Sequence, residues 1–152
     1  MSLKDDIQAA ITAAQKDQDA LRLSTLRLML AAIMNAEVAG KEKIELSNDQ
    51  TIDVLRSESK KRAESAEIYE QNGRVESAQK ERAEAAIIAE FLPAAMDDSA
   101  LNAIVAEEVA NAEAAGADGP KAMGVVVKAV RERVGQGADG SRIAAAVKSA
   151  LG

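Results

Sequence analysis

The residues of this sequence that are best suited to a chemical role are cations near its carboxyl end. Residues 119–152 contain six Lys and Arg against two acidic residues, a net charge of +4, whereas residues 1–118 have a net charge of −10. An acidic protein with a basic end is typical of chains that bind an anionic partner. If this segment is helical, its cations and one glycine share a stripe. The candidate nucleic-acid-binding residues are Lys121, Gly124, Lys128 and Arg131 on that stripe, with Arg142 further along.

Gly124 lies in the middle of the basic stripe. A glycine inside a helix costs about 1 kcal/mol relative to alanine, so its presence indicates that another group comes close to the backbone there. That group is either a phosphate or a neighbouring helix.

The residue types that are missing exclude several kinds of chemistry. The sequence has no Cys and no His, so it lacks thiolate nucleophiles, the usual general base and the commonest ligand of transition metals. Ser57 and Lys60 match the S-x-x-K pattern of penicillin-recognising enzymes, but the other motifs of that class are missing. We predict no catalytic residue, no cofactor and no metal site.

The segment GQGADG, residues 135–140, matches the dinucleotide-binding pattern G-x-G-x-x-G. That pattern requires a preceding strand and an acidic residue about twenty positions later, whereas a helix precedes this segment and the chain ends twelve residues after it. We therefore interpret it as a corner between two helices, in which Gly135 or Gly137 ends one helix and Asp139 caps the next.

The elements that must position these residues are all helices, because apolar residues recur with helical period and no segment alternates with period two. Four helices are expected in an amino-terminal domain, residues 1–92: from a Ser2 cap to Lys16, then 19–38, 48–71 after a Ser47 cap, and 75–92. Pro93 marks the boundary. Residues 94–152 are expected to form a three-helix bundle whose helices begin at Asp98 or Ser99, at Pro120 and at Ser141.

The apolar pattern also predicts which helix faces are buried. The helix over 19–38 is the most apolar, with one stripe that is widened by Leu21 and Leu28; the stripe is Leu23, Leu26, Leu30 and Ile33. The basic helix should bury Met123, Val127, Val130 and Val134. In the helix over 48–71, the charges of RSESKKR are interpreted as a solvated face with Glu58–Arg62 and Lys60–Glu64 pairs.

No apolar run approaches the length of a membrane span, and the start MSLKDDIQAA is acidic where a signal peptide would be basic. We expect a soluble cytoplasmic protein with no membrane partner.

Four stretches, in this order and spacing, resemble the YqeY family over nearly the whole chain: RLSTLRLMLAAIMNAE (22–37), RSESKKRAESAEIYEQNGR (56–74), EFLPAAM (90–96), and MGVVVKAV followed by GADG (123–130 and 137–140). The back half is similar to the tail domain of GatB, a subunit of the glutamine-dependent aspartyl/glutamyl-tRNA amidotransferase. The resemblance implies an all-helical fold, contact with tRNA, and a family-level carbon–nitrogen ligase activity with glutamine as amido-N-donor. At the corner the chain departs from the basic-Gly-basic pattern expected of the family, since it has Gly135, Gln136 and Gly137.

Three functions follow as alternatives. The chain is an accessory tRNA-binding protein that works with amidotransferase or tRNA-synthetase subunits, a non-enzymatic module whose basic tail meets an acidic protein surface, or a ligase component that is active only with other subunits. Tyr69 and Phe91 are the only aromatic residues and lie outside the tail, so RNA would be recognised by backbone and shape rather than by base stacking. Four to five phosphate contacts predict a log–log salt slope of about −3 to −4. The oligomeric state stays open.

Overall fold

Helices account for the regular secondary structure of the chain. The computed structural model describes residues 2–152, and in that range it contains no β-strand. The elements are α1 (Leu3–Lys16), α2 (Ala20–Glu37), α3 (Asn48–Gln71), α4 (Val75–Ala89), α5 (Asp98–Ala114), α6 (Gly119–Val134), the 3₁₀ turn η1 (Gly135–Gly137) and α7 (Gly140–Leu151). The predicted all-α class is confirmed. Over residues 2–152, no helix combines the length and the apolar character that a membrane span requires.

Most helices begin at a side chain that accepts a hydrogen bond from a backbone N–H group. Ser2, Ser47 and Asp139 cap α1, α3 and α7, as predicted, and the caps at Ser2 and Ser47 are capping boxes. The cap of α5 is Asp97, which accepts a hydrogen bond from the N–H of Ala100. The prediction of Asp98 or Ser99 was therefore wrong by one or two residues.

Helix α4 ends at Ala89, three residues earlier than predicted. The N–H groups of Glu90, Phe91 and Leu92 donate to carbonyls three residues back, so the chain tightens into 3₁₀-type turns. Pro93 explains this ending, because a proline disfavours the α-helical conformation in the residue before it.

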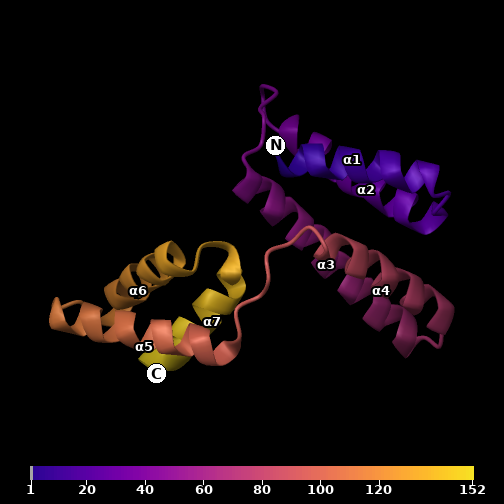
Figure 1. Cartoon of the computed structure of the whole chain (residues 1–152). Helices are drawn as coiled ribbons and strands as arrows, with labels where there is room; N and C mark the ends of the chain where they lie inside the picture. The colour runs from indigo at the N-terminus through magenta and orange to yellow at the C-terminus, as the bar shows by residue number, and fades with distance from the viewer. Residues whose placement is uncertain (1) are drawn as a thin grey trace. The chain divides into compact units, whose positions relative to one another are not determined.

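The chain divides into two compact units, the first ending at Leu92 and the second comprising Pro93–Gly152. In the first unit, α1 and α2 form one antiparallel pair and α3 and α4 another, and α2 packs against the other three helices (Figure 1). Its core is apolar and comes from all four helices; the buried members are Ile7, Ala14, Leu26, Met29, Ile33, Leu55 and Ile88. Because α2 contacts all three other helices, it is the central helix of this unit.

The buried face of α2 differs from the predicted one. Leu26 and Ile33 are fully buried, but Leu21 and Leu28 are exposed rather than part of the core. At 100° per residue, Leu21 and Leu28 point away from the line of Leu26, Met29 and Ile33. This helix is thus apolar on its outer side as well as on its inner side.

A buried carboxylate fastens the loop after α2. Glu37 is 3% exposed, accepts a hydrogen bond from Lys4 Nζ at 2.8 Å, and accepts a second from the N–H of Leu46. The hydrogen bond with Lys4 is the main reason that the pKa of Glu37 lies below its usual value. The ionised form of Glu37 is therefore the form that stabilises the folded state.

We expect Glu37→Gln to weaken the acid dependence of folding. Because the folded-state pKa of Glu37 is lowered, its contribution is present above the unfolded pKa of about 4.3 and is lost as the pH falls through the folded-state value. Urea midpoints at pH 7 and pH 3 would measure this: the variant should be less stable than the wild type at pH 7, and the gap should be smaller at pH 3. A gap of equal size at both pH values would contradict the assignment.

A second buried ion pair joins α3 to α4. Arg62 Nε lies 3.2 Å from Glu84 Oε2, and Arg62 Nη1 lies 2.9 Å from Glu58 Oε2. Glu84 is only 8% exposed, and this guanidinium is the cation that compensates its buried carboxylate. The predicted Glu58–Arg62 pair is present, whereas in residues 2–152 Lys60 makes no ion pair with Glu64.

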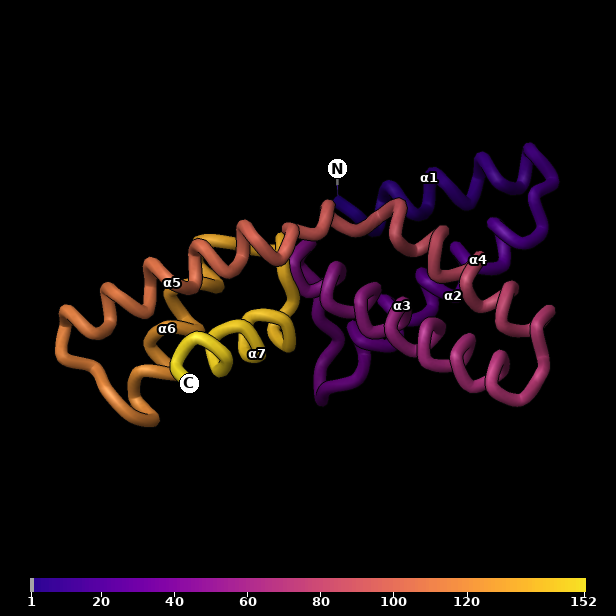
Figure 2. The backbone as a smooth tube through the Cα atoms, turned by 90° about the horizontal axis from the view of Figure 1, so that it is seen from below, coloured from indigo at the N-terminus to yellow at the C-terminus, as the bar shows by residue number. Residues whose placement is uncertain are grey.

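In the second unit, each of α5, α6 and α7 packs against the other two (Figure 2). Its core is built from aliphatic residues of all three helices; the buried members are Leu101, Val105, Ala112, Val126, Val130, Ala138, Ile143 and Val147. The corner between α6 and α7 is the predicted one, with Gly135 at φ +54° ending α6 and Asp139 capping α7. GQGADG is therefore a helix-to-helix turn.

Candidate nucleic-acid interface

One face of α6 carries the predicted cationic stripe. Lys121, Gly124, Lys128 and Arg131 are all exposed, and we call these four residues the basic face. At 100° per residue, its centre lies about half a turn from the buried line of α6, which is Ala122, Val126 and Val130. The basic face therefore points away from the core of its unit.

This buried line differs from the predicted seam. Val130 is buried as expected, but Met123, Val127 and Val134 are only partly buried and flank the line instead of forming it. Ala122 is buried near the start of α6, at the beginning of this line. The basic face would lie about a third of a turn from the predicted seam, whereas it lies about half a turn from the observed buried line.

The three cations of the basic face are unpaired. In residues 2–152, the structure shows no hydrogen bond or ion pair from Lys121 Nζ, Lys128 Nζ or the Arg131 guanidinium, whereas the nearby Arg133 is neutralised. Its Nη1 lies 2.7 Å from Glu107 Oε2 and 3.1 Å from Glu108 Oε1, and these hydrogen bonds raise the pKa of Arg133. Arg133 therefore stays charged and joins α6 to α5, and its charge is compensated by two carboxylates of α5.

Arg142 is not part of the basic face. Its Nη2 donates to the Met96 carbonyl and to Asp98 Oδ1, both at 2.8 Å, and the N–H of Met96 donates to the Gly137 carbonyl at 2.7 Å. These bonds fasten the segment before α5 to the α6–α7 corner. No sequence signal links Arg142 to Met96, because the pair is 46 residues apart.

Gly124 has open space above it. A Cβ atom built on Gly124 would meet nothing within 4 Å. The sequence predicts either a phosphate or a neighbouring helix close to this glycine. Within residues 2–152, no neighbouring helix comes close to it. The cost of about 1 kcal/mol for a mid-helix glycine is not offset by internal packing here.

The Arg131 guanidinium lies at the start of α7. A Cβ atom on Gly140 would be 3.4 Å from Arg131 Nη1, so the glycine leaves room for this side chain beside the first turn. The N–H groups of a helix start carry partial positive charge. The cationic surface of α6 thus continues to the α6–α7 corner. The acidic residue at this corner is Asp139, the N-cap of α7.

The charges of the second unit are segregated by element. Residues 93–118, which include α5, contain six acidic and no basic residues, while residues 119–152 have a net charge of +4. The unit therefore has a net charge of −2, and its cationic character is confined to α6 and α7.

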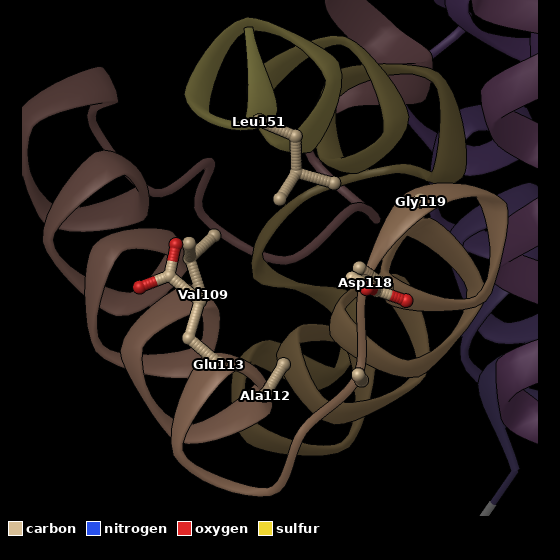
Figure 3. Close-up of a pocket in the computed structure, with 8 residues that line it drawn as sticks. Val109, Ala112, Glu113, Asp118, Gly119 and Leu151 are labelled. Carbon is tan, nitrogen blue, oxygen red and sulfur yellow. The ribbon is translucent and has the colours of Figure 1, made fainter.

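A pocket of about 250 Å³ lies in this unit at the end away from the α6–α7 corner. It is enclosed by the end of α5, the start of α6 and the end of α7 (Figure 3). Leu151 reaches over it from α7, and its charged lining residues are the carboxylates Glu113 and Asp118. It contains no residue of the basic face. Among the described residues, no group of three or more carboxylates forms a set that could hold a metal ion.

The family of the chain follows from a match to a sequence model. The model of the Yqey-like proteins matches residues 4–151. The chain belongs to the YqeY-like family. All four predicted stretches of resemblance lie within the matched range, so the predicted family is confirmed. No curated protein matches this YqeY-like chain at a significant level.

Proposed function

We propose that this YqeY-like protein is an accessory tRNA-binding protein, whose basic face contacts phosphate groups while other subunits perform the amidotransferase chemistry. The observation that carries the proposal is the set of three unpaired cations around an unobstructed glycine on the face opposite the core. Unpaired Lys and Arg on an exposed helix are the groups that neutralise nucleic-acid phosphates. The role that the family resemblance implies for the GatB tail supports tRNA as the polyanion.

The number of free cations sets the expected strength of binding. With Arg133 and Arg142 held by carboxylates, the basic face offers three cations for phosphate contacts, and Lys148 on α7 lies outside it. Three contacts give a log–log salt slope of about −2 to −3, which is shallower than the slope of about −3 to −4 that four to five contacts predict. Binding by the isolated chain should therefore be weak at physiological salt, and a larger complex would have to strengthen it.

Gly124→Ala tests the proposal, because it should change stability and binding in opposite directions. The variant should be more stable by about 1 kcal/mol, since alanine is the better helix former and its Cβ meets nothing. Its affinity for bulk tRNA should fall several-fold, since the new methyl group stands where a phosphate would approach the backbone. Anisotropy titrations of labelled tRNA at 20–150 mM KCl and urea unfolding of the same samples would measure both quantities.

The wild-type titration is the first control. An affinity that does not fall with salt, or no retention of tRNA at the lowest salt, would overturn the proposal. Equal tRNA affinity of Gly124→Ala and wild type would show that the phosphates do not approach the glycine.

A further inference from the structure

The outer side of α2 carries a second apolar line that the first unit does not use. Six residues follow each other at spacings of three and four, and all six are exposed; they are Leu21, Ser24, Leu28, Ala31, Asn35 and Val38. We call them the outer seam. Leu28 is 51% and Val38 is 56% exposed, and with Leu21 they lie on one line instead of being scattered.

The spacing of the outer seam is that of a two-helix coiled coil. Alternating steps of three and four place residues on one line along a helix, at the two positions of the heptad that face a partner helix. Arg27 is the only charged residue among the exposed residues of α2. A helix surface with this pattern normally packs against another helix.

We infer that a second copy of the chain covers the outer seam, with the two α2 helices antiparallel about a two-fold axis. In an antiparallel pair of identical helices, a residue of one copy faces a residue of the other, and the two residue numbers add up to the same total for every facing pair. One register, centred between Leu28 and Ala31, matches the whole seam: Leu28 of each copy faces Ala31 of the other, Leu21 faces Val38, and Ser24 faces Asn35.

This register favours a second copy over an unrelated partner, because the seam is complementary to itself. The large Leu28 meets the small Ala31, so the helices can approach closely, and the polar Ser24 and Asn35 meet each other and can form a hydrogen bond that fixes the register. An identical patch on both subunits is what a two-fold interface requires. No acidic residue on the seam would attract a basic partner.

The loop after α2 carries one more exposed aliphatic residue. Ile44 is 51% exposed, and its N–H donates to the Glu37 carbonyl at 2.9 Å, so the loop holds it beside the end of α2. An 18-residue helix offers about 27 Å of contact length. An interface made by one helix of this length from each copy is small, and we expect a weak dimer with a dissociation constant of about 1–100 µM.

Disulfide cross-linking of the full chain tests the register directly. The sequence has no Cys, so Ser24→Cys with Asn35→Cys introduces the only two thiols. In the antiparallel dimer each new thiol faces its counterpart on the other copy, and oxidation should give a covalent dimer. Each single variant should stay monomeric on a non-reducing gel, since Ser24 and its two-fold mate would be about 16 Å apart along the axis. Equal cross-linking of the double and single variants would overturn the register.

Sedimentation tests the dimer without cysteine. The wild type should approach twice the mass of the chain as its concentration rises to the millimolar range, and Leu28→Glu should stay monomeric with unchanged helicity. Ile68→Glu is the matched control, because Ile68 is 58% exposed on α3 and lies off the seam; it should dimerise as the wild type does. A wild type that stays monomeric throughout would overturn the inference.

Discussion

Replacing both Lys128 and Arg131 with glutamate should abolish tRNA retention while leaving the protein folded. The double variant removes two of the three free cations of the basic face and puts two negative charges in their place. Charge reversal at phosphate contacts repels the ligand as well as losing the contact, and we expect an affinity loss on the order of 100-fold at low salt. Both side chains are exposed, so the urea midpoint should change little. Filter retention of labelled tRNA would measure the affinity loss.

A matched control separates the position of the charges from their number. Lys60→Glu with Lys80→Glu changes the net charge by the same amount, at two exposed residues of α3 and α4. That control should lose only the small part of the affinity that depends on overall charge. Equal losses in the two double variants would show that the basic face has no special role, and a large drop in stability of Lys128→Glu with Arg131→Glu would show that it is structural.

Arg62→Met should destabilise the first unit by about 3 kcal/mol. The substitution leaves the carboxylate of Glu84 buried between α3 and α4 without its cation, and an unpaired buried charge is among the most costly defects in a folded protein. Urea unfolding followed by circular dichroism would measure the loss in the free energy of unfolding.

The double variant Arg62→Met with Glu84→Met is the control for this prediction. When both charges are replaced by apolar groups of similar volume, no unpaired charge is buried, and the stability should return to within about 1 kcal/mol of the wild type. A single variant as stable as the wild type would mean that water reaches Glu84 and that the ion pair is dispensable.

The sequence predicts where helices begin and end better than it predicts which faces they bury. Caps depend on neighbours in sequence, and Ser2, Ser47 and Asp139 are found in the predicted roles. Burial depends on the packing of distant segments. The pattern of α2, which is apolar on both sides, therefore predicts Leu28 as part of the buried stripe, whereas the structure has it exposed.

In the candidate site, too, local features are predicted from the sequence and contacts between distant segments are not. The exposure of Lys121, Lys128 and Arg131 follows from helical period alone, since they stand opposite aliphatic residues. The bonds that hold Arg133 and Arg142 do not follow from it, because each partner lies more than twenty residues away along the chain. Counting cations in the sequence thus overstates how many can meet a phosphate.

The segregation of acidic residues onto α5 and of basic residues onto α6 and α7 gives the second unit an electric dipole moment that its small net charge conceals. A polyanion exerts a torque on such a body before any contact forms, so the unit would arrive with α6 leading and α5 trailing. Added salt shortens the range over which this alignment acts, and it would therefore slow association more than it speeds release.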